Sequence, residues 1–187
     1  MNIPERHRRA VEYFGALVHD VGDDQWASPT PCTDWDVRAL VHHLVYENVW
    51  TPPIFEGQTI DEVGDRFEGD LLGNDPKTAW DQAAKEAIAA VQDKGAMSRK
   101  VHLSFGDVPG EEYAIELFTD HLIHAWDLAK GIGADGALDP ELVEACYEIN
   151  KPQEDRLKTS GFFGPKVEPP PNADLQTKLL AVFGRTA

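Results

Sequence analysis

A carboxylate and an imidazole lie four residues apart in the segment Thr119–Leu128, at Asp120 and His124. The surrounding residues predict a buried helix, and residues four apart sit above one another on one helix face. Asp120 and His124 can therefore point toward a common centre. Carboxylate oxygen and imidazole nitrogen are both common metal ligands, so the pair suits a divalent cation.

His43 supplies a third candidate ligand, from the earlier amphipathic segment Asp34–Trp50. At about 100° per residue, His43 borders the apolar face of this helix, whereas His42 points to solvent. Two imidazoles and one carboxylate between helices give a three-ligand site with room for water or substrate. The sequence thus predicts a metal site at His43, Asp120 and His124, with Zn²⁺ expected first and Ni²⁺, Fe²⁺ or Mn²⁺ as alternatives.

Structural interpretations of these residues stay open. His43 alone fits a hydrogen-bonded histidine at the core edge, and Asp120 with His124 fits an ion pair on a solvated face. His121 and Glu47 are rival ligands, because each lies three or four residues from a candidate ligand on the same helix. The joint pattern favours the metal site, because an isolated buried carboxylate would cost several kcal/mol.

Asp127 and Cys32 could also act near this site. Asp127 lies one turn after His124 and either orients that ligand or pairs with Arg38, the role that the sequence slightly favours. Cys32 precedes a predicted helix, whose dipole can activate a thiol, but a small buried apolar role is favoured. The eleven positions between Cys32 and His43 correspond to about 16 Å along a helix axis. This spacing predicts that Cys32 is too distant to serve the metal unless its loop folds back.

Apolar residues at helical spacing predict the elements that must position these side chains. The predicted helices span residues 4–21, 34–50, 76–94, 111–130, 140–158 and 173–183. Residues 98–105 predict a short extended segment, residues 55–75 a loop or lid that can hold one short helix, and residues 162–172 an extended tail. The fold class is therefore mainly all-α, a four-helix bundle with long crossover loops.

Length and charge restrict the classes of function. The 187 residues fit one domain, predicted over residues 1–187, and the formal net charge is −16. Such a surface repels nucleic acids and anionic lipids, so neither partner is expected. No apolar run is long enough to span a bilayer, and the N-terminus shows no signal-peptide pattern. Because Cys32 and Cys146 form no CxxC motif, a reducing cytoplasm is the expected location.

Three blocks of sequence carry a resemblance to a known family. They are TPCTDWDVRALVHHL at residues 30–44, FGDVPG at 105–110 with residues 120–133, and FGP at 163–165 with LLAVFGR at 179–185. Together they resemble the metal-binding family that contains the N-terminal domain of mycothiol-dependent maleylpyruvate isomerase, in the DinB-like superfamily. The resemblance implies a DinB-like four-helix bundle whose metal ligands fall on His43, Asp120 and His124.

The resemblance also implies a chemistry. Relatives in the superfamily use a low-molecular-weight thiol as cosubstrate, and a divalent metal would activate it as thiolate. The expected function is a metal-dependent, mycothiol-type S-transferase or isomerase acting on a small electrophile. The alternative is a non-catalytic protein that binds a metal or a small ligand. Residues 55–75 are expected to form part of the substrate pocket, and a homodimer is a further expected arrangement.

This sequence departs from the isomerase in two places. It has Asp120 where the isomerase has Glu, and it is too short to hold the isomerase's extra C-terminal domain in full. The resemblance therefore implies metal binding more firmly than any named reaction.

Overall fold

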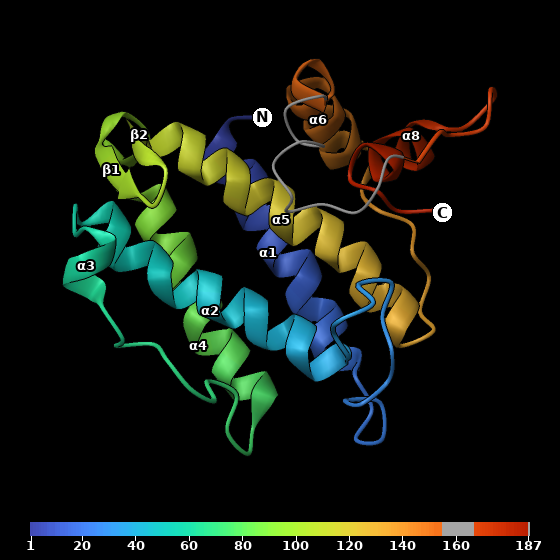
Figure 1. Cartoon of the computed structure of the whole chain (residues 1–187), viewed down its shortest axis with the longest axis horizontal. Coiled ribbons are helices and arrows are strands. Elements are labelled where there is room, and N and C mark those ends of the chain that lie inside the picture. Colours follow the sequence, from blue (N-terminus) through green and yellow to red (C-terminus); the bar gives the residue numbers. More distant parts are fainter. Residues whose placement is uncertain (155–166, 187) are drawn as a thin grey trace. The chain divides into compact units, whose positions relative to one another are not determined.

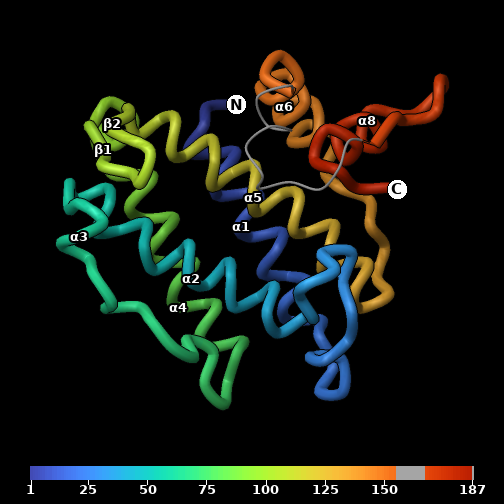
Figure 2. The backbone as a smooth tube through the Cα atoms, viewed as in Figure 1, coloured from blue at the N-terminus to red at the C-terminus, as the bar shows by residue number. Residues whose placement is uncertain are grey.

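The computed structural model describes residues 1–154 and 167–186, which form two compact units, Met1–Asp135 and Gly136–Ala187 (Figures 1 and 2). Helices dominate both units, which confirms the mainly helical class predicted from the sequence. The single domain over residues 1–187 stays a prediction.

Four long helices build the first unit and confirm the predicted bundle. They are α1 (Ile3–Asp20), α2 (Val37–Phe55), α4 (Pro76–Gln92) and α5 (Gly110–Gly131). α1 packs along α5, and α4 packs against both α1 and α2, as Figures 1 and 2 show. α2 also contacts α5, and this contact brings the candidate ligands together.

The core of this unit follows from the helical spacing of apolar side chains. Each helix presents a stripe of residues three or four positions apart, and burying these stripes against one another drives the packing. Buried members of the stripes include Phe14, Val18, Leu40, Leu44, Trp80, Ala87, Phe118 and Leu122. The polar faces of the helices are left for solvent and for the candidate site.

Helix α2 differs from the prediction at both ends. Its N-cap is Asp36, whose side chain accepts a hydrogen bond from the Ala39 backbone nitrogen at 2.8 Å, so the helix begins later than the predicted residue 34. The helix also runs through Pro52 and Pro53 to Phe55, although proline removes a backbone donor and favours an earlier end. Phe55 is buried and stacks on Tyr113. We infer that this burial offsets the cost of the two prolines.

The connections between helices carry smaller elements. A hairpin of β1 (Lys100–Leu103) and β2 (Gly106–Pro109) confirms the extended segment predicted over residues 98–105 and adds a second strand after it. The loop predicted over residues 55–75, called the lid segment from here on, connects α2 to α4. It contains one short helix, α3 (Ile60–Val63), which starts with a capping box. The 3-10 turn η1 (Ala96–Ser98) packs against the start of α5.

The second unit contains α6 (Pro140–Asn150), the 3-10 turn η2 (Lys151–Gln153) and α8 (Leu175–Val182). α6 packs against α8. Residues 155–158 of the predicted fifth helix, and residues 162–166 of the predicted extended tail, lie outside the described residues. In the described part of the chain, no helix combines the length and apolarity needed to cross a membrane.

His7 lies in the core of the first unit. Its side chain is fully buried, and its ring meets that of His121 edge to face at 5.7 Å between centroids. Neither ring nitrogen of His7 has a hydrogen-bond partner among the described residues. Burial, followed by the charge of His121, holds the pKa of His7 well below its usual value. His7 is therefore neutral in the folded chain near neutral pH.

This burial predicts a pH dependence of stability. Below about pH 6.5 the unfolded chain protonates His7 while the folded chain does not, so stability falls as the pH falls. Replacing His7→Leu should reduce the slope of unfolding free energy against pH between pH 7 and 5, by up to about 1.4 kcal/mol per pH unit. Urea denaturation across this range measures the slope. The matched control is His19→Gln, at a half-exposed histidine paired with Asp81. Equal slopes in His7→Leu and the unmodified chain would contradict the prediction.

Candidate metal centre

The structure brings together the three ligands predicted from the sequence. His43 extends from α2, and Asp120 and His124 extend from α5. One oxygen of Asp120 lies 3.1 Å from His43 Nε2, and the other lies 3.3 Å from His124 Nε2. The candidate ligand atoms all lie within 4.8 Å of one another, which suits a shared metal ion. The role of these residues as metal ligands stays a prediction.

This cluster has a closed side and an open side. The side chain of His124 is 9% exposed, whereas those of His43 and Asp120 are 26% and 30% exposed. His124 therefore anchors the cluster in the bundle, and the other two residues face the surface. A metal ion held here would keep positions accessible to water or to a small molecule.

His124 also contacts a second set of residues through its other ring nitrogen. Its Nδ1 lies 2.9 Å from Oδ2 of Asp127, a fully buried carboxylate. The Cys32 thiol donates to the same oxygen at 3.2 Å, and its Sγ lies 3.8 Å from His124 Nδ1. Cys32, His124 and Asp127 form a second candidate metal-binding group, which shares His124 with the first.

The position of Cys32 overturns the expectation that it lies far from the candidate ligands. The loop before α2 folds back on itself, as backbone bonds from Val37 to Ser28 and from Arg38 to Trp26 show. A side-chain bond from Thr30 to the Trp35 carbonyl, at 2.7 Å, tightens the turn further. The distance along the helix axis therefore does not describe the path of the loop.

The sequence-based preference for an Arg38–Asp127 pair is also wrong. The Arg38 guanidinium instead bonds both carboxylate oxygens of Asp70 and the carbonyl of Gly73, each at 3.0 Å. Asp127 meets His124 and Cys32, so it has the alternative role considered from the sequence, as a partner that orients a ligand.

Neither rival ligand belongs to a candidate metal-binding group among the described residues. His121 faces the core, with Nδ1 donating to the Leu117 carbonyl at 2.7 Å. Glu47 lies close enough to the cluster for the charges of its residues to affect the Glu47 carboxyl group. Burial, followed by the charge of Asp120, raises the pKa of Glu47 to about 7.

Asp120 and His124 each stabilise the charged form of the other. Burial alone would raise the pKa of Asp120, but the charges and hydrogen bonds of His124 and His43 outweigh it and hold this pKa well below its usual value. Burial would lower the pKa of His124, but Asp120, with further bonds to Asp127 and Cys32, raises it well above its usual value. Without a metal ion, a protonated His124 thus balances the charge of Asp120. A cation would displace a proton from Nε2.

Trp35 covers the two histidines, a role that the sequence analysis missed. Its ring lies 4.6 Å from that of His43 and 5.6 Å from that of His124, between centroids. Trp35 directly precedes the N-cap Asp36, so the start of α2 fixes its position. The sequence does contain a signal for this role. Trp35 is a large aromatic residue next to the start of the helix that carries the candidate ligand His43.

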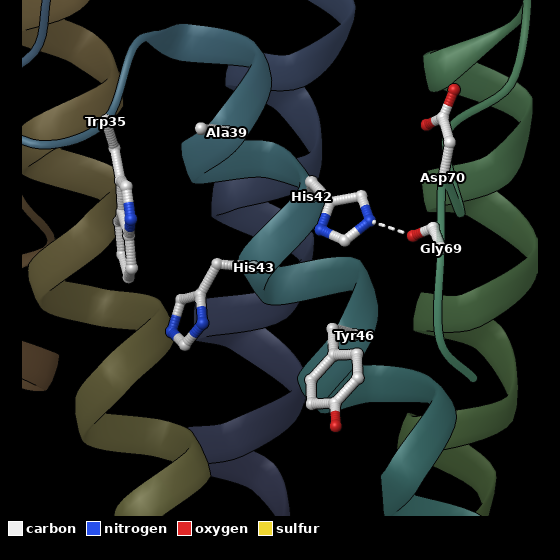
Figure 3. A pocket seen from close by; sticks show the side chains of 7 residues that line it. All are labelled: Trp35, Ala39, His42, His43, Tyr46, Gly69 and Asp70. Atoms are coloured by element: carbon white, nitrogen blue, oxygen red, sulfur yellow. Dashed lines mark hydrogen bonds between the residues drawn. The ribbon is translucent and has the colours of Figure 1, made fainter. Parts of the chain in front are cut away.

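A pocket of about 550 Å³ opens beside His43. Its lining consists of Trp35, Ala39, His42, His43, Tyr46, Gly69 and Asp70 (Figure 3). Gly69 and Asp70 belong to the lid segment. That residues 55–75 form part of a substrate pocket stays a prediction. His42 points away from His43 in Figure 3 and bonds the Gly69 carbonyl through Nε2 at 2.8 Å.

The sequence of this chain is similar to those of known proteins. The family model for the mycothiol maleylpyruvate isomerase N-terminal domain matches residues 7–129. Two Mycobacterium tuberculosis proteins, named uncharacterized proteins MT0763 and Rv0738, are each 36% identical over 141 residues, which cover 73% of this chain and 70% of each relative.

A solved structure shows the same fold. The crystal structure of a mutant of the mycothiol-dependent maleylpyruvate isomerase matches with a TM-score of 0.60 and 15% identity, over 84% of this chain and 70% of that one. The family model spans more than half of the sequence, and it includes every residue of both candidate metal-binding groups. The chain therefore belongs to the mycothiol maleylpyruvate isomerase N-terminal domain family.

Proposed function

We propose that this chain binds one divalent metal ion, Zn²⁺ in the first instance, through His43, Asp120 and His124. We further propose that it uses the ion to activate a low-molecular-weight thiol, such as mycothiol, toward a small electrophile. The observation that carries the proposal is the single carboxylate of Asp120, which presents one oxygen to each imidazole on the open side of the bundle. Family membership supports it, because a solved relative is named as mycothiol-dependent.

The donor set fits the proposed ion. Two imidazole nitrogens and one carboxylate suit Zn²⁺ and related divalent metals, and three protein ligands leave a position for substrate. When bound, the metal supplies positive charge that favours the thiolate over the thiol near neutral pH. Asp127 accepts the Nδ1 proton of His124 and thereby directs the Nε2 lone pair toward the centre. Trp35 covers one side of the imidazoles and limits the approach of water.

Two arguments favour this ligand set over Cys32, His124 and Asp127. The first set includes His43, which lines the pocket where a thiol and an electrophile could meet. In the second set, the Asp127 side chain is fully buried, so an ion held there would be less accessible to a substrate. In this proposal, Cys32 and Asp127 orient the ring of His124 and do not bind the metal.

Metal content of single variants tests the ligand set. His43→Ala should lose stoichiometric zinc, because two ligands remain, whereas His42→Ala should retain it, because His42 bonds Gly69 and not the cluster. Cys32→Ser should also retain it. Elemental analysis after zinc loading and desalting measures the ratio of metal to protein. Loss of zinc in Cys32→Ser together with retention in His43→Ala would assign the metal to the second group instead.

The supporting role of Asp127 predicts a graded effect. Asp127→Asn should weaken zinc binding by about 10- to 100-fold without abolishing it, as expected for a partner that orients a ligand. Competition with a chromophoric chelator gives the affinity. Asp81→Asn is the matched control, since Asp81 also bonds a histidine but lies exposed on α4. An unchanged affinity in Asp127→Asn would reject the orienting role.

Thiol conjugation tests the activity and separates it from the non-catalytic alternative. With mycothiol and 1-chloro-2,4-dinitrobenzene, a carbon–sulfur bond forms, chloride leaves with its electron pair, and the thiol proton passes to solvent. We expect turnover that chelator abolishes and zinc restores, and that falls at least about 100-fold in His43→Ala, because the activating charge is lost. Stoichiometric zinc without acceleration over the uncatalysed reaction would instead support a metal-binding protein that is not an enzyme.

A further inference from the structure

The face of α5 that presents His124 to the candidate centre extends to the end of the helix. Asp127 and Gly131 follow at spacings of three and four residues, so the three residues lie along one face. The loop before α2 packs on this face. Its Cys32 thiol donates to Asp127 at 3.2 Å, and the ring of Trp35 lies 5.6 Å from that of His124. Two residues of the loop therefore contact one candidate ligand or its partner.

Gly131 lets the same loop approach α5 closely. A Cβ atom placed on Gly131 would lie 3.0 Å from Thr30 Cγ2 and 3.1 Å from Val37 Cγ2. Carbon atoms in ordinary contact lie about 3.5–4.0 Å apart, so a side chain at this position would push the loop away from the helix. The absence of a side chain at Gly131 thus leaves space for the methyl group of Thr30.

The hydroxyl of Thr30 joins the two loop residues that reach the candidate centre. It accepts a hydrogen bond from the Cys32 backbone nitrogen at 3.2 Å and donates one to the Trp35 carbonyl at 2.7 Å. The Cys32 carbonyl, at 3.2 Å, is the more distant acceptor for the same proton. A hydroxyl can donate and accept at once, because it has one proton and two lone pairs. The Thr30 hydroxyl therefore closes the turn between Cys32 and Trp35.

The Thr30 hydroxyl and the start of α2 hold Trp35 from both sides along the chain. The N-cap Asp36 directly follows Trp35 and holds it from the C-terminal side. The Thr30 hydroxyl holds the Trp35 carbonyl from the N-terminal side. Thr33 and Asp34, which precede Trp35, have exposed side chains and add no buried surface to the turn. Side-chain packing by these two residues therefore cannot replace the bonds of the hydroxyl.

We propose that Thr30 is a positioning residue of the candidate centre. Its methyl group packs on Gly131, and its hydroxyl holds the ring of Trp35 across the imidazoles of His43 and His124. Thr30 makes no hydrogen bond to a candidate ligand in the described part of the chain, so it acts through Trp35. The inference rests on the proposed function in one respect, that the position of Trp35 affects zinc binding.

Nuclear Overhauser effects in the metal-free protein test the positioning directly. Cross-peaks between the ring protons of Trp35 and those of His43 report the contact of the two rings, whose centroids lie 4.6 Å apart. Thr30→Val keeps the shape of the side chain and removes the hydroxyl, so it should weaken these cross-peaks several-fold. Thr30→Ser keeps the hydroxyl and should retain them. Cross-peaks of unchanged intensity in Thr30→Val would overturn the proposal.

Two further variants separate positioning from a general loss of stability. Thr78→Val is the matched control, because its hydroxyl bonds Asp75 at 2.7 Å at the start of α4, outside the candidate centre. It should retain the cross-peaks, and an equal loss in Thr78→Val would reject a specific role for Thr30. Gly131→Ala should weaken the cross-peaks by displacing the loop, although alanine favours a helix more than glycine does. Unchanged cross-peaks in Gly131→Ala would reject the role assigned to the methyl group.

Zinc affinity, measured by competition with a chromophoric chelator, tests the consequence for the metal. Thr30→Val should bind zinc several-fold more weakly than the unmodified chain, and Thr30→Ser should restore the affinity. An unchanged affinity in Thr30→Val would overturn the role at the metal. The two measurements also separate this inference from the proposed function. Cross-peaks that weaken as expected in a chain that binds no zinc would keep the positioning of Trp35 and reject the proposed function. Stoichiometric zinc with unchanged cross-peaks would do the reverse.

Discussion

The carboxylate of Asp120 is the group on which the candidate site depends. A carboxylate between two helices loses much of its hydration, and it is stable there only if its charge is matched. His43 and His124 supply that match from different helices, one on each oxygen. The bond to His43 thereby joins α2 to α5 at the level of the site. The three candidate ligand atoms lie within 4.8 Å of one another, so a divalent ion bound there would compete with the protons of these groups.

The surroundings of this carboxylate make the geometry specific. Asp127 fixes the ring of His124 from behind, and Trp35 packs across both imidazoles. Asp127 lies on α5 with His124, whereas Trp35 belongs to the loop before α2, which folds back through backbone bonds and carries Cys32 onto Asp127. The rigid helices thus place the candidate ligands, and the loop closes the site around them. Such division between scaffold and loop is common in functional sites.

The sequence predicted the parts of this site that depend on local periodicity. Asp120 and His124 are four residues apart on one helix, and the helical phase correctly separated His43 from His42. It could not predict the contact of Cys32 with Asp127, because that contact follows from a loop path set by long-range bonds. Nor could it predict that α2 runs through two prolines, because burial of Phe55 outweighs a local preference.

The tandem histidines give α2 two different contacts within one turn. His43 faces the cluster, while His42, about 100° around the helix, fastens the lid segment through the Gly69 carbonyl. Arg38, one turn earlier, adds a second fastening through Asp70. Any rotation of α2 about its axis would therefore loosen the lid and withdraw a candidate ligand at the same time. One helix thus holds both the lid segment and a ligand of the candidate metal centre.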